Sequence, residues 1–297
     1  MDEPELHFLD CPDGGKGHRM AYWQWGDPLA DHTVVCAHGL SRQGRDFDHL
    51  AKALIERAGH PVRVVCPDVV GRGKSDWLTD PHAYQIPTYV GDMLALLAHL
   101  KPKTLDWVGT SMGGLIGMGV CAHAHAVGAQ VRRLVLNDVG PAIQWEALVR
   151  IGTYLGKPAQ FESVQDAAQA LWEISTSFGP HTPEQWMALS WAMVKPLLQG
   201  QEGFILHYDP SIAVPVRAMT REQAAQGEEQ LWQLYDGLTA QTLLLRGTDS
   251  DLLSIDTAKA MMQRGPQARL LEFEGIGHAP TLIAEDQVQA VASFLLG

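Results

Sequence analysis

The chain has 297 residues, of which 46% are hydrophobic, and this length and composition indicate one large globular domain with an insertion and exclude an intrinsically disordered protein. The 34 acidic and 22 basic residues give a net charge of −12, which repels nucleic acids and anionic membranes. No local basic patch offsets this charge, and no apolar run reaches the length of a membrane span. We therefore expect neither a nucleic-acid partner nor a membrane association.

The N-terminal segment Met1–Glu5 carries three acidic residues and has neither the basic nor the apolar region of a signal peptide. A cytoplasmic location is therefore expected. The cysteines form no C-x-x-C pair, so we expect no metal site and no disulfide from them. We predict that all four are reduced: Cys11, Cys36, Cys66 and Cys121.

Strands and helices alternate along most of the chain. Residues 6–9 and 20–25 predict an antiparallel hairpin at the edge of a sheet, because a Pro/Gly turn cluster separates them. Continuous apolar runs at 33–37 and 62–68 predict strands that are buried on both faces. Further strands are predicted at 105–108, 133–136, 242–247 and 270–273, and helices at 47–55, 89–100 and 288–296. The alternation predicts an α/β fold with a mostly parallel sheet and helices on both faces.

The alternation stops between residues 142 and 237, where the pattern is mostly helical. This segment holds five of the nine tryptophans. We predict a helical cap at 142–237, inserted between two parts of the core, 1–141 and 238–297.

A serine lies at the point where a predicted strand turns into a helix. Ser111 stands between Gly109 and Gly113 at G-x-S-x-G spacing, after the apolar run Leu105–Val108. Glycines at these positions let the strand and helix backbones approach each other, and the serine hydroxyl then projects from the top of the sheet. We identify Ser111 as the candidate nucleophile.

An activated serine needs a base and donors for the oxyanion. His278 follows the last predicted strand between glycine-rich residues, which makes it the best candidate for the base among the thirteen histidines. Met112 and Leu40 are placed to supply backbone N–H groups to an oxyanion hole. His38 precedes that second donor, and we expect it to shape the turn.

Four motifs, in this order along the chain, together resemble the α/β-hydrolase superfamily: the turn 38–40, Pro67-Asp68 with the loop 71–75, the serine motif 109–114, and Gly277-His278. The resemblance covers essentially the whole chain and is closest to the capped branch with small carboxylesterases, enol-lactonases and carbon–carbon bond hydrolases. It implies an α/β-hydrolase fold with a helical cap, and it implies no metal or organic cofactor.

The third member of the triad departs from the usual pattern of this superfamily. That pattern implies an acid at position 250, where this chain has Ser250 flanked by Asp249 and Asp251. Some members carry the acid at the end of the strand before the cap, and Asp138 matches that position. Both choices keep the chain order Ser, acid, His. We favour Asp138 and keep Asp251 as the alternative.

The sequence predicts a serine hydrolase that cleaves a small carboxylic ester or lactone through an acyl-enzyme intermediate. The alternatives are hydrolysis of a carbon–carbon bond in a dienol-ketone, acyl transfer to an alcohol, and a ligand-binding receptor on the same fold. We expect a monomer or a homodimer whose partner is a small-molecule substrate. The candidate substrate-binding residues are Trp145, Trp172, Trp186 and Trp191, which would form an apolar wall over Ser111, with Arg42 and Arg72, which would lie at the surface or bind a substrate carboxylate.

Overall fold

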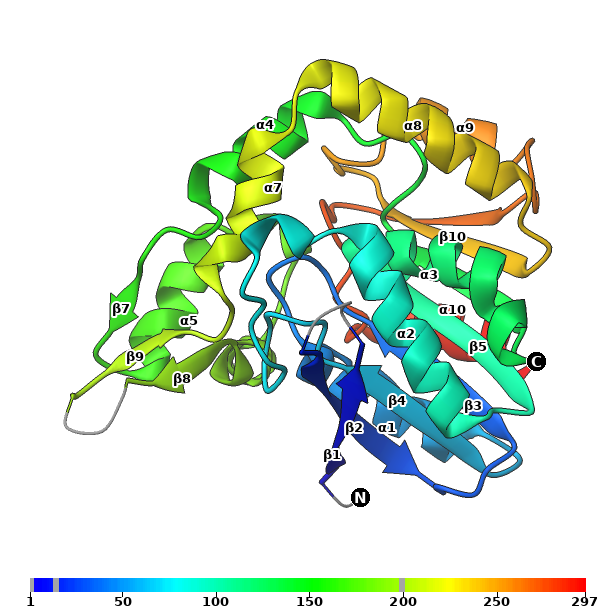
Figure 1. The fold of residues 1–297 in the computed structure, drawn as a ribbon, viewed down its shortest axis with the longest axis horizontal. Helices are drawn as coiled ribbons and strands as arrows, with labels where there is room; N and C mark the ends of the chain where they lie inside the picture. Colours follow the sequence, from blue (N-terminus) through cyan, green and yellow to red (C-terminus); the bar gives the residue numbers. More distant parts are fainter. Residues whose placement is uncertain (1–2, 13–15, 198–200) are drawn as a thin grey trace.

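The computed structural model describes residues 3–12, 16–197 and 201–297. Its centre is an eight-stranded sheet of order β1-β2-β4-β3-β5-β6-β10-β11 (Figure 1). Strand β2 pairs antiparallel with both of its neighbours, and all other neighbours pair in parallel. The strands are β1 Glu5–Cys11, β2 His18–Gly26, β3 His32–Ala37, β4 Val62–Pro67, β5 Thr104–Thr110, β6 Val131–Asn137, β10 Gln241–Gly247 and β11 Arg269–Phe273. Every predicted strand is present, and the predicted edge hairpin is confirmed.

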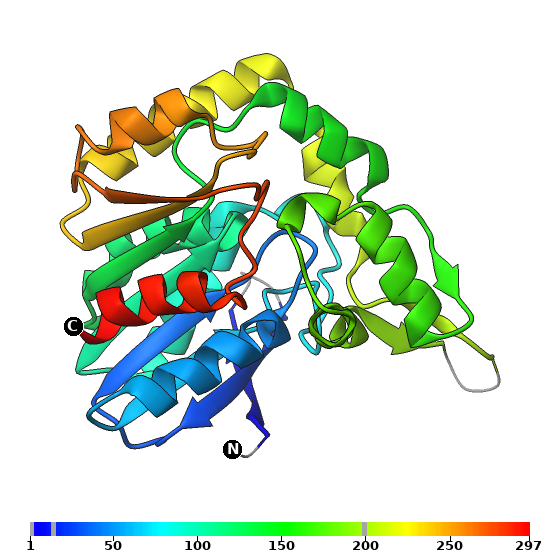
Figure 2. The ribbon, with the colours of Figure 1, turned by 180° about the vertical axis from the view of Figure 1, so that it is seen from behind.

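Helices cover both faces of this sheet, which confirms the predicted α/β-hydrolase architecture. Helices α1 and α10 pack against each other on one face, which Figure 2 shows in front. Helices α2 and α3 pack together on the other face. Each face has its own apolar cluster, so the central strands are buried on both sides as their continuous apolar runs predict. The bounds are α1 Asp48–Arg57, α2 Ile86–Leu100, α3 Met112–His123, α9 Ile255–Met261 and α10 Glu285–Leu296.

In its described residues, the segment between β6 and β10 contains five α-helices and a small sheet, and most of it lies beside the core at the left of Figure 1. The helices are α4 Trp145–Tyr154, α5 Val164–Glu173, α6 Pro183–Ser190, α7 Ala213–Ala218 and α8 Arg221–Asp236. The sheet is antiparallel, of order β7-β9-β8, with strands β7 Gln160–Phe161, β8 Val194–Pro196 and β9 Phe204–Leu206. Strands of two or three residues are too short to show a period of two, which is why the sequence pattern missed them.

The last helix of this segment, α8, packs on the core. Tyr235 is fully buried, and its hydroxyl donates a hydrogen bond of 2.8 Å to the carbonyl of Met261 in α9. Helix α8 also contacts α3. The bounds 142–237 remain a prediction for the cap, and the structure adds that the end of this range joins the core's apolar cluster.

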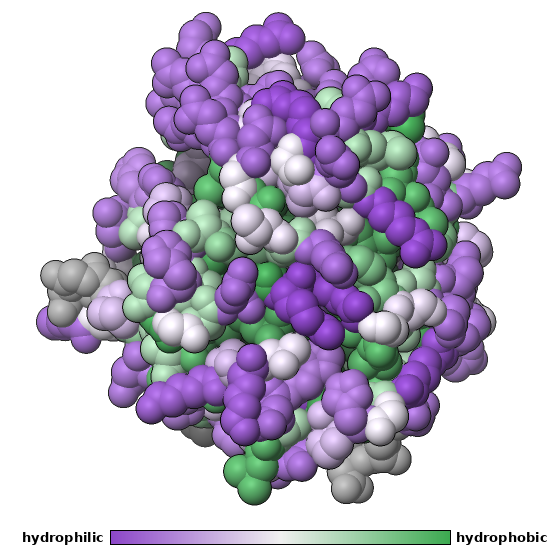
Figure 3. All heavy atoms as spheres, turned by 90° about the vertical axis from the view of Figure 1, so that its right-hand side faces the viewer, coloured by the Kyte–Doolittle hydropathy of each residue, from purple (hydrophilic) through white to green (hydrophobic). Residues whose placement is uncertain are grey.

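The opposite side of the molecule, away from α4 to α7, is mostly hydrophilic with scattered apolar areas (Figure 3). Among the described residues, no helix is both long enough and apolar enough to cross a membrane. All four cysteines are free thiols, as predicted.

Candidate active site

Ser111 occupies the sharp turn between β5 and α3. Its backbone has φ 53° and ψ −118°, a conformation that a residue with a Cβ adopts only where its surroundings impose it. The surroundings do so through close approach: a Cβ added to Gly109 would overlap the Gly113 carbonyl, and a Cβ added to Gly113 would overlap the Ala37 carbonyl. The two glycines are therefore required for the turn that exposes the serine hydroxyl.

The structure brings Ser111, His278 and Asp138 together in one chain of hydrogen bonds. His278 Nε2 lies 2.9 Å from Ser111 Oγ, and His278 Nδ1 lies 2.7 Å from Asp138 Oδ2. The Asp138 side chain is fully buried, and that of His278 is 16% exposed. A base within hydrogen-bond distance of the nucleophile, itself oriented by a buried carboxylate, is the arrangement that activates serine in hydrolases.

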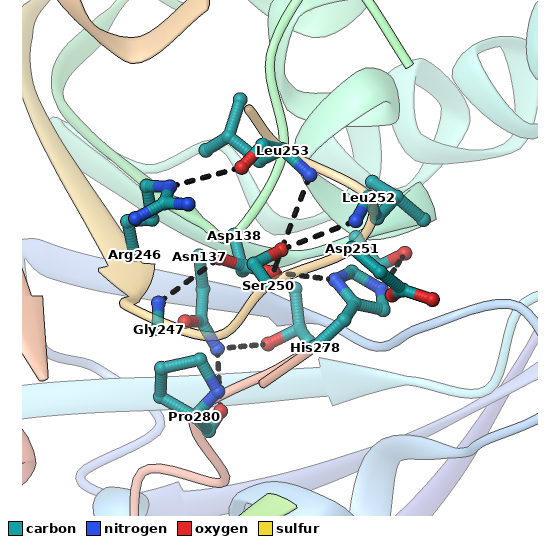
Figure 4. Close-up of polar contacts among 12 residues, drawn as sticks. Asn137, Asp138, Arg246, Gly247, Ser250, Asp251, Leu252, Leu253, His278 and Pro280 are labelled. Carbon is teal, nitrogen blue, oxygen red and sulfur yellow. Dashed lines mark hydrogen bonds and ion pairs between the residues drawn. The ribbon is translucent and has the colours of Figure 1, made fainter. Parts of the chain in front are cut away.

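Strand order explains why Asp138 reaches the histidine. Asp138 follows β6, which pairs in parallel with β10, and its backbone N–H donates to the carbonyl of Leu245 in that neighbour at 2.8 Å. Its backbone has φ 55°, so the chain turns sharply where the strand ends. Its carboxylate accepts hydrogen bonds from the backbone N–H of Gly247 at 3.1 Å and from the Ser250 hydroxyl at 2.6 Å (Figure 4).

Asp251, the alternative acid, has a different partner. Its carboxylate lies 2.6 Å from the Arg150 guanidinium, and its side chain is 52% exposed. The hydrogen-bond partner of His278 Nδ1 is therefore Asp138 and not Asp251.

The turn that carries Leu40 lies beside the serine. A Cβ added to Gly39 would lie 3.7 Å from the Ser111 Cβ. His38 is fully buried and holds this turn: its Nδ1 donates to the Gly39 carbonyl at 2.7 Å, and its Nε2 accepts the Val69 N–H at 2.9 Å. Burial lowers the pKa of His38 to about 3, so the ring stays neutral and keeps this hydrogen-bond pattern. His38 therefore shapes the turn, as the sequence predicts.

Arg72 corrects an expectation, because it is neither at the surface nor open to a substrate. Its side chain is fully buried, and each nitrogen of its guanidinium has a partner inside the protein. Nε donates to the Leu40 carbonyl at 2.8 Å, and Nη1 donates to the Val70 carbonyl at 2.8 Å and to the Tyr89 hydroxyl at 3.0 Å. Nη2 lies 3.6 Å from Met112 Sδ. One guanidinium thus contacts both residues of the predicted oxyanion hole.

Arg42 joins the core to the cap. It makes two hydrogen bonds to Asp46, of 2.6 and 2.8 Å, and Nη2 donates to the Leu189 carbonyl of the cap at 3.0 Å. The neighbouring Gln43 side chain donates to the Ala192 carbonyl. The loop after β3 therefore holds the end of α6 and the residues that follow it, and the Arg42 guanidinium is bound to protein partners.

The four tryptophans lie in different surroundings, and the apolar wall over Ser111 stays a prediction. Trp172 and Trp186 pack edge to face, with ring centroids 5.0 Å apart, inside an apolar cluster that belongs mainly to the cap. Trp186 also donates to the Ala168 carbonyl at 2.7 Å. Trp191 is 47% exposed and packs under the Arg45 guanidinium. Trp145 is the first residue of α4 and is half-buried.

Two cap contacts that sequence reasoning missed lie beside the histidine loop. The Ser177 carbonyl accepts the Gly277 N–H at 2.6 Å, and His181 Nε2 lies 2.8 Å from Thr281 Oγ1. No sequence pattern marks a backbone carbonyl as a partner. The cap thus contacts the loop that carries His278 on both sides of the histidine.

One group among the described residues has the composition of a metal site, outside the serine site. Cys11, His18 and Asp92 are buried, with ligand atoms within 4.8 Å of one another, on the hairpin and α2. His18 Nε2 lies 2.9 Å from Asp92 Oδ2. Burial, together with the nearby Asp92 carboxylate, raises the pKa of the Cys11 thiol to about 12, so the thiol keeps its proton.

The fold and the hydrogen-bonded Ser, His and Asp define this protein as a hydrolase of the α/β class. Residues 34–294 match the sequence model of the Alpha/beta hydrolase family, and the chain belongs to that family. A 3-hydroxybutyrate-oligomer hydrolase from Cupriavidus necator is 47% identical over 296 residues, covering 99% of this chain and 98% of the relative. These matches support an enzyme with hydrolase activity rather than the receptor alternative.

Solved structures agree with this assignment. An alpha/beta hydrolase from Novosphingobium aromaticivorans superposes with a TM-score of 0.83 at 33% identity and 99% coverage of both chains. The thioesterase domain from the curacin biosynthetic pathway superposes with a TM-score of 0.74 at 24% identity, covering both chains completely, and shows the fold alone.

Proposed function

We propose that this hydrolase is a serine esterase that cleaves oligomers of 3-hydroxybutyrate. The observation that carries the esterase activity is the chain of hydrogen bonds from Ser111 through His278 to the buried Asp138. The substrate class is supported by the relative that is 47% identical over nearly the full length of both chains. A cytoplasmic location and a monomeric or dimeric state belong to the same proposal.

The geometry supports a two-step mechanism. His278 Nε2 takes the proton of Ser111, and the serine oxygen attacks the ester carbonyl. The N–H groups of Leu40 and Met112 stabilise the negative charge on the carbonyl oxygen. His278 then gives its proton to the departing hydroxyl of the next unit, and the acyl group remains on Ser111. Water, deprotonated by the same nitrogen, attacks the acyl group and restores the free serine. Asp138 stabilises the imidazolium in both steps.

Three cap residues contact the loops around the site through their backbone carbonyls. Ser177 contacts the loop of the base, and Leu189 and Ala192 accept hydrogen bonds from the loop next to the oxyanion turn. An oligomer of 3-hydroxybutyrate is a thin polyester with one methyl group per unit.

The test is hydrolysis of the purified trimer of 3-hydroxybutyrate, followed by chromatography and mass spectrometry of the products. We expect release of monomer and dimer, with a kcat/KM at least about tenfold above that for p-nitrophenyl butyrate, since a substrate that fits the site gains transition-state binding. Hydrolysis in ¹⁸O-water should place one ¹⁸O in the new carboxylate.

An inactive Ser111→Ala variant is the control for contaminating esterases. Cleavage of the p-nitrophenyl ester without cleavage of the trimer would contradict the proposed substrate class but would support the esterase activity. The same assay separates the remaining alternatives: a dienol-ketone tests carbon–carbon hydrolysis, and an added alcohol tests acyl transfer.

A further inference from the structure

Ser250 lies in the loop between β10 and α9, at the position where the resemblance implies the acid. Its hydroxyl donates to Asp138 Oδ2 at 2.6 Å. This Asp138 oxygen also lies 2.7 Å from His278 Nδ1. Figure 4 shows the serine and the histidine on either side of this carboxylate. Ser250 is thus one hydrogen bond away from the base, although it touches neither Ser111 nor a reacting atom.

The direction of the Ser250 proton is fixed by the loop itself. The backbone N–H groups of Leu252 and Leu253 both donate to Ser250 Oγ, at 3.3 and 3.1 Å. A hydroxyl has one proton and two lone pairs. Because the two N–H groups take up the lone pairs, the proton has to point at Asp138. Ser250 is therefore locked as a donor.

This donor helps to orient the Asp138 carboxylate. Asp138 Oδ2 accepts from Ser250 and His278, and Oδ1 accepts from the Gly247 N–H at 3.1 Å. Because Ser250 and Gly247 each donate to one oxygen of Asp138, the carboxylate is oriented as the acceptor for His278 Nδ1. The Nδ1 atom of His278 must then carry a proton, which leaves the Nε2 lone pair for the hydroxyl of Ser111.

We propose that Ser250 is a positioning residue of the triad, whose hydroxyl holds the Asp138 carboxylate aimed at His278 and thereby sets the tautomer of the base. This inference rests on the proposed function, in which Ser111, His278 and Asp138 carry out ester hydrolysis. It assigns a role to the serine that replaces an acid, and it predicts that the carboxylate can be moved from position 138 to position 250.

The first test uses a matched pair, Ser250→Thr and Ser250→Val, which have nearly the same shape but differ in the hydroxyl. A hydrogen bond to a charged group contributes enough that its loss should lower kcat by about ten- to a hundredfold. We expect Ser250→Val to show this loss with KM within about twofold of the wild type, because the ester does not touch position 250. Ser250→Thr keeps a hydroxyl, so its kcat should lie within about threefold of that of the wild type.

Ser254→Ala is the control within the same region. Ser254 Oγ also accepts a backbone N–H, from Thr257 at 3.1 Å, but its partners are Thr257 atoms only and it caps α9. Thermal unfolding of all variants checks the fold. Ser254→Ala should lower stability and keep the kcat of the wild type, whereas Ser250→Val should lower kcat.

The second test exchanges donor and acceptor. In the double variant Asp138→Asn with Ser250→Asp, the amide at 138 donates and the carboxylate at 250 accepts from His278 Nδ1. The N–H groups of Leu252 and Leu253 remain available to that carboxylate. We expect its kcat to exceed that of Asp138→Asn alone by at least about tenfold, since it again has a carboxylate on the base.

Equal kcat in Ser250→Val and Ser250→Thr, or a double variant no more active than Asp138→Asn, would overturn the inference. Failure of the proposed function is distinguishable, because Ser111→Ala would then keep its activity. Loss of activity in Ser111→Ala together with full turnover in Ser250→Val overturns the role of Ser250 alone.

Discussion

The core around the active site and the cap hold their side chains in place in different ways. In the core, strand ends and strained turns fix Ser111 and Asp138 by backbone position, with φ values of 53° and 55°. In the cap, the large side chains pack on one another, as Trp172 and Trp186 do in the apolar cluster of α5 and α6. We therefore expect a substitution at these core positions to change the turnover, and a substitution in the apolar cluster of the cap to change the free energy of unfolding.

Ser111→Ala should give the largest effect. Removing the nucleophile of a triad costs on the order of a millionfold in turnover, and the oxyanion hole retains a small residual rate. The fold should not change, because among the described residues the Ser111 hydroxyl is hydrogen-bonded to His278 alone. Steady-state kinetics and labelling by a fluorophosphonate measure this loss. Turnover within a few-fold of the wild type would remove Ser111 from the mechanism.

Asp138→Asn should come next, with a loss of about a thousandfold or more in turnover and little change in KM. The amide cannot accept the His278 N–H in the same way, so the base loses its tautomer. Asp251→Asn is the matched comparison: its carboxylate is half-exposed and pairs with Arg150, and exposed pairs contribute little. We expect near-normal turnover there. A large loss at Asp251 with normal turnover in Asp138→Asn would reverse the assignment.

The cap should respond in stability. Trp186 is 8% exposed, so Trp186→Ala should lower the free energy of unfolding by about 3 to 5 kcal/mol. Trp191→Ala, at an exposed position, should change it by less than about 1 kcal/mol. Urea unfolding measures both, and the rates on esters of increasing length show whether the cap selects substrates. If Trp186→Ala kept full stability but changed chain-length preference, Trp186 would belong to the substrate wall after all.

The most gradual effect, at most about 1.4 kcal/mol for each pH unit, concerns the oxyanion turn. The pKa of His38 is about 3 in the fold and about 6.5 in the unfolded chain, so only the unfolded state takes up this proton between those values. The contribution of His38 to stability is therefore complete above pH 6.5 and is lost as the pH falls toward 3, by at most about 1.4 kcal/mol per pH unit. His38→Gln should remove this slope.

His49→Gln, at an exposed position, is the control for that measurement. Burial raises the pKa of Asp68 to about 6, which gives a slope of the opposite sign between pH 3.8 and 6. Asp68 is present in all three proteins, so its contribution cancels in the difference between them. Parallel curves for the wild type and His38→Gln would contradict the neutral, buried ring.

The sequence by itself determined the elements of the core and the position of the nucleophile. Long apolar runs such as 33–37 and the glycines around Ser111 are local signals, and their meaning does not depend on distant residues. His278 could be found because only one histidine follows the last strand in a glycine-rich loop.

Only the tertiary structure decided which partners these residues have. Asp138 and Asp251 both satisfy the chain order, and the choice depends on β6 and β10 being neighbours, a long-range pairing. Arg72 resembles a surface residue in its polar loop, but the fold closes Leu40, Tyr89 and Met112 around it. Periodicity reports which face of an element is apolar, whereas a hydrogen bond depends on the distance between atoms that are far apart in the chain.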